Sequence, residues 1–336
     1  MTSVDAKQRI AAAHRDEAAA KNQAARLSIL AAAFLIAIKT ITGFLTGSIS
    51  VWASLLDSLM DIFASVVNFF AVRAASRPAD EDHTYGHGKA ESLAGLFQAM
   101  VITASGLFLI REAIKRIREP HEITSEWLGI GTMAIAIAVS LALVARLRKV
   151  ARDTESPALA SDAVHYASDI YTNGSALVAL AIVYFSGWKI VDPIISITIS
   201  LYILWSAFTV AREAVDILMD RRLPQEIDEQ VAAVVSRYQG QGVFGFHDLR
   251  TRRSGSLKFI DLHLDVERRL TFEQAHAISV RVLREIEAEI PRSRVSIHTD
   301  PAEGDAETRR RGDAAREENH AETRRHGDAA RERQSD

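Results

Sequence analysis

The chain has 336 residues, of which 48% are hydrophobic and 25% are charged, and its formal net charge at pH 7 is −3. This nearly balanced charge gives no electrostatic reason to expect nucleic-acid binding. The sequence contains no cysteine. Disulfides and thiolate zinc sites are therefore excluded, and any metal ion must bind to His, Asp or Glu side chains.

The first 26 residues are polar and favour helix, which does not match a cleaved secretory signal and predicts a cytoplasmic lead-in over residues 1–26. After them come six mainly apolar segments, each long enough to cross a bilayer as a helix. They cover residues 27–46, 49–75, 90–110, 127–147, 158–185 and 190–210, and they predict a membrane domain over residues 27–220. An even number of crossings places both termini on the same side.

Basic residues indicate which side that is. Lys and Arg are concentrated in the lead-in and after the second, fourth and sixth apolar segments, so the positive-inside rule places these ends and both termini in the cytoplasm. The connection after the third segment, residues 111–126, fits less well because it contains four basic residues beside four glutamates.

Beyond residue 220 the pattern becomes that of a soluble domain. Residues 226–238 and 272–288 favour helix, while 246–251, 258–266 and 294–299 favour strand, which is an α-β-β-α-β order. This order predicts a cytoplasmic α+β domain of the ferredoxin-like or metallochaperone-like kind over residues 221–302. Residues 303–336 contain a charged 15-residue sequence twice, starting at 306 and at 321, and are predicted to form a disordered tail.

Two of the apolar segments carry ionisable residues on a polar stripe. Asp57 and Asp61 lie one helical turn apart in the second segment, and His165 and Asp169 have the same spacing in the fifth. Charges at bilayer depth are costly, so four such groups require a partner. A cation would be one, and three carboxylates with one imidazole suit tetrahedral zinc better than magnesium or calcium. The alternative is that these residues only join the helices by hydrogen bonds or relay protons.

Two details of this arrangement stay open at the level of the sequence. Asp162, three residues before His165, could support the metal ligands without binding the ion itself, could start the helix, or could do neither. Measured from the outer ends of the two segments, Asp57 and Asp169 also lie at different depths, by about 12 Å at a rise of about 1.5 Å per residue.

The loop after the second segment contains a second group of candidate ligands. Asp80, His83 and His87 lie within one short polar stretch. This stretch predicts either a metal site or simply a polar turn.

The soluble domain contains a third group. Residues 260–266 alternate between apolar and polar, so their polar side chains share one strand face, and two residues of the last strand share a face in the same way. Two more histidines are near in sequence, and together these residues could close a metal site; solvated sheet faces are the alternative. The candidates are His247, Asp261, His263, Asp265, His276, His298 and Asp300.

Several separated motifs resemble those of the cation diffusion facilitator family, and within it the bacterial zinc- and iron-efflux type. They are DSLMD in the second segment, HYASD in the fifth, PADEDHTYGHGKAES in the loop, and HDLRTRRSG and HTDP in the soluble domain. The resemblance runs from Arg26 to Pro301, with the motifs in the same order and spacing. The chain departs from the family pattern in its repeat tail and in a short insertion between Asp220 and His247.

This resemblance implies a homodimer in the bacterial cytoplasmic (inner) membrane, with no organic cofactor, that exports divalent cations in exchange for protons. The cation is expected to be Zn²⁺, which would also act as a regulatory ligand, or otherwise Cd²⁺, Fe²⁺ or Mn²⁺. A charge interlock between Lys89 and Asp220 is implied to hold the dimer together near the membrane surface. The implied metal ligands are Asp57, Asp61, His165 and Asp169 in the membrane, Asp80, His83 and His87 in the loop, and His247, His263, His276, His298 and Asp300 in the cytoplasmic domain.

The sequence therefore predicts a transporter and not an enzyme. Protonation of His165 or of an aspartate would weaken the intramembrane site, so protons entering from outside would expel the metal there. An intramembrane metallohydrolase would need a general base such as that of an H-E-x-x-H motif, which the sequence lacks. If the protein were a membrane-tethered metal sensor, its functional site would lie in the C-terminal domain, and the ionisable residues of the second and fifth segments would have no role.

Overall fold

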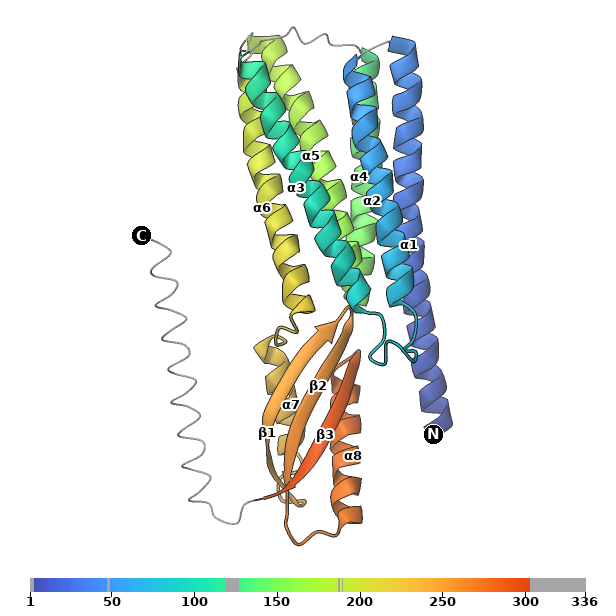
Figure 1. Ribbon diagram of the computed structural model, residues 1–336, viewed down its shortest axis with the longest axis vertical. Helices are drawn as coiled ribbons and strands as arrows, with labels where there is room; N and C mark the ends of the chain where they lie inside the picture. Colours follow the sequence, from blue (N-terminus) through green and yellow to red (C-terminus); the bar gives the residue numbers. More distant parts are fainter. Residues whose placement is uncertain (1–2, 47–48, 119–126, 187, 189, 303–336) are drawn as a thin grey trace, which may run out of the picture. The chain divides into compact units, whose positions relative to one another are not determined.

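The computed structural model describes residues 3–46, 49–118, 127–186, 188 and 190–302. The predicted tail, residues 303–336, lies outside the described residues, as does most of the connection between the third and fourth helices. Six long helices come first, and two shorter helices and three strands follow (Figure 1). The long helices are α1 (Ser3–Thr46), α2 (Ile49–Ala75), α3 (Lys89–Arg118), α4 (Trp127–Thr154), α5 (Pro157–Ser186) and α6 (Val191–Leu218).

The first six helices run side by side as a bundle (Figure 1). Among the described residues, five of them are long and apolar enough to cross a membrane, and α5 is outside that set. The sequence of α5 carries polar residues over much of its length, including Asp162, His165 and Asp169. α1 continues the polar lead-in and the first apolar segment as one helix without a break.

Small side chains let the bundle helices approach closely. One buried cluster joins the first five helices, and it includes Ala24, Ala25 and Ala158 together with the ring of Tyr166. α3 and α6 pack along each other around Ile102, Ile203 and Ala207. Small residues at helix contacts are typical of membrane bundles, where association depends on van der Waals packing.

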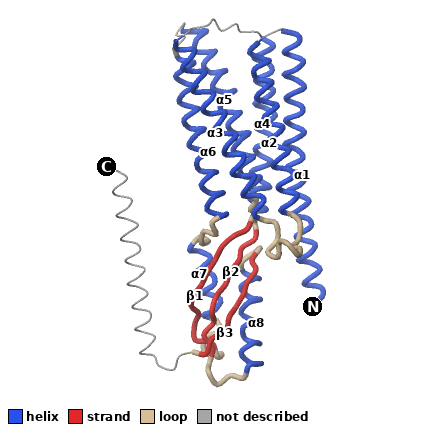
Figure 2. Tube along the Cα trace, in the orientation of Figure 1, coloured by secondary structure: helices blue, strands red, loops and turns tan. Residues whose placement is uncertain are grey.

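The remaining elements form a separate α+β core. They are α7 (Gln225–Ser236), β1 (Val243–Ser254), β2 (Leu257–Val266), α8 (Phe272–Glu289) and β3 (Ser293–Pro301), and the strand order in the sheet is β1-β2-β3 (Figure 2). The predicted α-β-β-α-β order is therefore confirmed, with β1 longer than expected. Thr271 begins α8 with a capping box that includes Gln274.

Alternation along β2 separates the core of this domain from its other face. Ile260, Leu262, Leu264 and Val266 are buried and pack with α7 and α8 in one apolar cluster. The residues between them, including His263, point to the opposite face of the sheet. By backbone packing, the described residues divide into two compact units, those within 1–223 and 251–259, and those within 224–250 and 260–302.

Candidate metal centres

Three of the four predicted intramembrane ligands converge between α2 and α5. Asp61, His165 and Asp169 each offer one ligand atom, and these atoms lie within 4.8 Å of one another. His165 is only 3% exposed, and its Nε2 lies 3.2 Å from Oδ1 of Asp61. The side chain of Asp57 lies outside the described part of the structure. The convergence places one imidazole and two carboxylates where a dication could bind.

The difference in depth that the sequence suggested does not keep these residues apart. Asp61 lies twelve residues after the start of α2 at Ile49, and Asp169 lies seventeen residues before the end of α5 at Ser186. At about 1.5 Å per residue the two differ by about 7.5 Å along their helices. The ligand atoms nevertheless lie within 4.8 Å of one another.

A buried hydrogen-bond network lies one turn from His165. Asp162 is fully buried, and its Oδ2 accepts a hydrogen bond of 2.6 Å from the Ser28 hydroxyl of α1. The Tyr166 hydroxyl donates to the Ser28 carbonyl at 3.0 Å and lies 2.9 Å from the Ser65 hydroxyl. Asp162 is not among the converging ligand atoms. Sequence reasoning did not find this network, because Ser28 belongs to a helix more than a hundred residues away.

The loop group is also brought together. The ligand atoms of Asp80, His83 and His87 lie within 4.8 Å of one another. His87 Nε2 is 3.2 Å from Asp80 Oδ2, and the backbone N–H of His83 donates to Asp80 Oδ1 at 2.7 Å. This backbone hydrogen bond is the main reason that the pKa of Asp80 is lowered. Gly86 has a φ of +85°, which the tight turn between the two histidines requires.

The two residues of the predicted interlock form an ion pair within one chain. Lys89 Nζ lies 3.0 Å from Asp220 Oδ1 and also donates to the Leu218 carbonyl at 3.2 Å. Asp220 lies two residues beyond the end of α6 at Leu218 and has a φ of +56°. The pair therefore ties the start of α3 to the end of α6.

The cytoplasmic group lies on the face of the sheet opposite its core. His247, His263 and Asp300 bring ligand atoms within 4.8 Å, and His263 Nδ1 is 2.8 Å from Asp300 Oδ2. His298 Nε2 lies 3.3 Å from Asp300 Oδ1, next to this group. His276 is not part of the group, because it lies on α8, where its ring stacks on Phe272.

Asp265, a candidate from the alternation of its strand but absent from the ligands that the family resemblance implies, lies beside this group. Asp265 Oδ1 lies 3.0 Å from His247 Nδ1. Its signal was present in the sequence, since Asp265 shares the strand face of His263.

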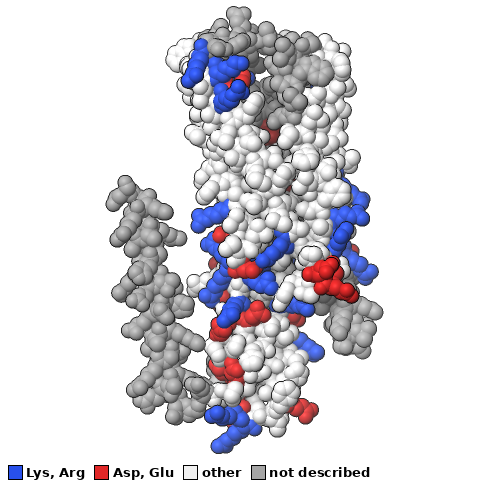
Figure 3. Space-filling view, in the orientation of Figure 1, with Lys and Arg blue, Asp and Glu red and all other residues white. Residues whose placement is uncertain are grey.

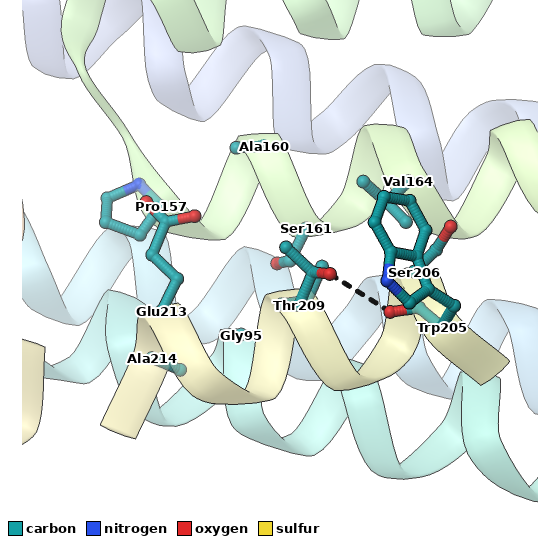
Figure 4. Close-up of a pocket in the computed structure, with 11 residues that line it drawn as sticks. Gly95, Pro157, Ala160, Ser161, Val164, Trp205, Ser206, Thr209, Glu213 and Ala214 are labelled. Carbon is teal, nitrogen blue, oxygen red and sulfur yellow. Dashed lines mark hydrogen bonds between the residues drawn. The ribbon is translucent and has the colours of Figure 1, made fainter. Parts of the chain in front are cut away.

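A pocket between α3, α5 and α6 is not a candidate for metal binding (Figure 4). Its lining is mostly apolar, and Glu213 is its only ionisable residue. The Thr209 hydroxyl on its wall donates within α6 to the Trp205 carbonyl at 3.0 Å. None of the converging ligands lines this pocket.

Comparison with known proteins identifies the family. Residues 25–219 match the cation efflux transmembrane domain, and residues 223–302 match the cation efflux protein cytoplasmic domain. The chain belongs to the cation efflux, or cation diffusion facilitator, family. The resemblance noted in the sequence motifs is thereby confirmed.

The sequence similarity to members of this family extends over most of the chain. It is 42% identical over 281 residues to the cation-efflux pump FieF of Klebsiella pneumoniae subsp. pneumoniae, which covers 84% of the chain and 93% of the relative. It is also 42% identical over 280 residues to the FieF of Yersinia pestis (strain Pestoides F), covering 83% and 92%. A solved structure of the zinc form of CzrB is 31% identical and covers 24% of the chain and 92% of that structure, with a TM-score of 0.23.

Membership of the family establishes the general character of this protein. It is a multi-pass membrane protein with a cytoplasmic C-terminal domain, and it belongs to transporters of divalent metal ions and not to enzymes. Figure 3 agrees with a membrane domain, since Lys and Arg gather near the ends of the helices and the broad surface between them consists of other residues. The predicted fold class and the transport of metal ions are therefore confirmed.

Proposed function

We propose that the protein exports Zn²⁺ from the cytoplasm in exchange for protons, through an intramembrane site formed by Asp57, Asp61, His165 and Asp169. The observation that carries this proposal is the convergence of Asp61, His165 and Asp169 between α2 and α5, with His165 buried. Asp57 lies one turn before Asp61 on α2 and would complete the set.

The composition of this site favours a borderline transition metal. Three carboxylates and one imidazole give four ligands, which suits tetrahedral zinc, while calcium and magnesium take six or more oxygens. Sites of this kind select only moderately among divalent metals, so Cd²⁺, Fe²⁺ and Mn²⁺ are secondary substrates in the proposal.

Proton exchange follows from the same ligands. Protonation of His165 removes the lone pair that binds metal, and protonation of an aspartate removes a charge. Protons that reach the site from the outer side would therefore displace the ion, and release of those protons to the cytoplasm would restore the site.

The other two groups are proposed to regulate transport. The loop ligands Asp80, His83 and His87 lie at the cytoplasmic ends of α2 and α3, and the cytoplasmic domain belongs to a type named for dimerisation. We expect a homodimer in a bacterial cytoplasmic membrane, with Zn²⁺ bound in its cytoplasmic domain by His247, His263, Asp300 and the adjacent His298 and Asp265.

Zinc flux in proteoliposomes with an imposed pH gradient tests the proposal. The purified protein should carry zinc in one direction and protons in the other, and Asp61→Ala should abolish both fluxes. Glu213→Gln is the matched control, because it removes an acidic group of α6 that belongs to none of the three clusters. Zinc flux that ignores the pH gradient would refute the exchange, and full zinc transport by Asp61→Ala would refute the site.

A further inference from the structure

A lysine lies inside the apolar part of α1. Lys39 belongs to the span Arg15–Leu45, which is long and apolar enough to cross a membrane. Lysines in such positions normally extend toward the membrane surface, because an ammonium group is costly at bilayer depth. Lys39 instead reaches across to α2, where its Nζ donates to the Ser58 hydroxyl at 2.7 Å.

This contact places the ammonium beside the proposed transport site. Ser58 is 2% exposed and lies three residues before Asp61, which puts both side chains on neighbouring positions of one face of α2. Lys39 is therefore one hydrogen bond away from a residue that adjoins a metal ligand. Neither the sequence motifs nor the three clusters of ligands include it.

Its position along the helices is on the outer side of that ligand. The C-terminal domain is cytoplasmic, so α1 ends and α2 begins on the outer side. Ser58 lies nine residues after the start of α2, and Asp61 lies twelve residues after it. The backbone of Ser58, whose hydroxyl accepts from the ammonium, thus lies about 4.5 Å further toward the outside than that of Asp61, at about 1.5 Å per residue.

We propose that Lys39 is a tethered counter-cation for the transport site. When the metal ion has left, the ammonium neutralises part of the carboxylate charge that would otherwise be unpaired in the membrane. When the ion is bound, the fixed positive charge repels it, which speeds release to the outside and opposes rebinding from there. The inference rests on the proposed function, since it needs Asp61 to be a ligand of the transported metal.

The simplest alternative is a purely structural hydrogen bond between α1 and α2. The two explanations differ in whether the positive charge of Lys39 matters. Lys39→Gln keeps a hydrogen-bond donor and removes the charge, whereas Lys39→Arg keeps both. Thr42→Val is a matched control, because Thr42 lies one turn further along α1 and is 2.9 Å from the Thr132 hydroxyl of α4, so its replacement removes a helix contact without changing charge.

Inhibition of transport by zinc on the outer side is the measurement that decides. Full-length protein is placed in liposomes with its cytoplasmic domain facing the bath, and initial zinc uptake is measured at increasing zinc concentrations inside. Lys39→Gln should be inhibited at a zinc concentration lower by about tenfold or more, as expected for losing a unit charge near a dication in a partly buried site. Lys39→Arg should stay closer to the wild type than Lys39→Gln, and Thr42→Val should not change the inhibition.

Inhibition of Lys39→Gln at the wild-type zinc concentration would overturn the proposal. If Lys39→Gln is inactive, equilibrium zinc binding to the same full-length protein decides instead, where tighter binding supports the proposal and unchanged binding overturns it. Asp61→Ala, measured in parallel, distinguishes a failure of the proposed transport site from a failure of the counter-cation proposal. Transport by Asp61→Ala would refute the transport site itself, whereas an inactive Asp61→Ala beside an unaltered Lys39→Gln refutes only the counter-cation.

Discussion

His165 is the residue on which the chemistry of the proposed site depends most. It is the only nitrogen donor among the four candidate ligands, and it is buried within reach of Asp61. An imidazole both favours zinc over harder ions and exchanges protons near neutral pH. A single side chain would thus contribute to metal choice and to proton coupling.

Replacement of this imidazole by a carboxylate should therefore change the metal preference. His165→Asp makes the site all-oxygen and more negative, which favours harder ions such as Mn²⁺. We expect the ratio of zinc flux to manganese flux to fall by about tenfold or more, measured in proteoliposomes at equal protein load. An unchanged ratio would mean that His165 does not bind the transported ion.

A buried ion pair also depends on single residues. Lys21 of α1 and Glu91 of α3 are 5% and 2% exposed, and Lys21 Nζ lies 3.0 Å from Glu91 Oε1. The Ser156 hydroxyl donates to the other carboxylate oxygen of Glu91. Because both charges are withdrawn from water, each depends on the other.

Removal of one member should therefore be strongly destabilising. Glu91→Ala leaves Lys21 buried with the more distant carboxylate of Glu17, 4.0 Å from Nζ, and should lower the free energy of unfolding by about 3 kcal/mol. Glu112→Ala is the control, since Glu112 forms an exposed pair with Arg116, whose loss should cost about 0–1 kcal/mol. Unfolding in detergent, followed by intrinsic fluorescence, measures both. The double change Lys21→Met with Glu91→Leu should recover much of the loss, and equal stability of Glu91→Ala and Glu112→Ala would contradict this account.

At the scale of elements, polar contacts join α7 and α8 at one end of the cytoplasmic domain. The Tyr238 hydroxyl, just after α7, donates to Glu285 of α8, and Arg237 Nη1 is 2.8 Å from the same carboxylate. The hydrogen bond from Tyr238, and after it that from Arg237, lowers the pKa of Glu285. A carboxylate with a lowered pKa stabilises the folded state above its unfolded pKa, and this contribution is lost as the pH falls through the lowered value.

The contribution of this contact should therefore depend on pH in a defined direction. Tyr238→Phe should reduce the thermal stability of the fragment 221–302 at pH 7, and the difference from the wild type should shrink as the pH is lowered, because Glu285 loses its charge. Thermal unfolding followed by circular dichroism measures this in the presence of a chelator. Arg268→Gln, at an exposed position between β2 and α8, is the control for loss of a surface polar group. A difference that grows on acidification would contradict the assignment.

At the scale of the whole molecule, two compact units divide the proposed tasks. The converging intramembrane ligands belong to the first unit, and His247, His263 and Asp300 belong to the second. In the proposed function an ion that crosses the membrane passes the first set, whereas the second set lies in the cytoplasmic domain. Under that proposal, metal bound there would regulate transport and would not lie on the path across the bilayer.

His263→Ala should consequently affect regulation more than maximal transport. We expect a changed dependence of activity on cytoplasmic zinc, or a weaker dimer, with a maximal rate within about twofold of the wild type, since this ligand set is separate from the crossing site. Zinc titrations of transport and sedimentation of the detergent-solubilised protein measure the two effects. Complete loss of transport in a well-folded His263→Ala would contradict this division of tasks.

The sequence by itself determined the elements of this protein. Apolar length identified the helices of the membrane domain, because a bilayer requires about 20 apolar residues for each crossing. Strand alternation and helical periodicity gave the α-β-β-α-β order and placed Asp61, His165 and Asp169 on polar stripes. These are local properties of the chain, so they can be read without knowing what each element contacts.

Only the tertiary structure decided which elements meet and at what level. The approach of α2 to α5 that brings Asp61 to His165, and the hydrogen bond from Ser28 of α1 to Asp162, depend on packing between segments far apart in sequence. The same holds for the separation of His276 from the His263 group, because His276 lies on a helix that contacts the sheet by its apolar face. Periodicity fixes the direction of a side chain relative to its own element, whereas the neighbour it reaches is fixed by how the elements pack.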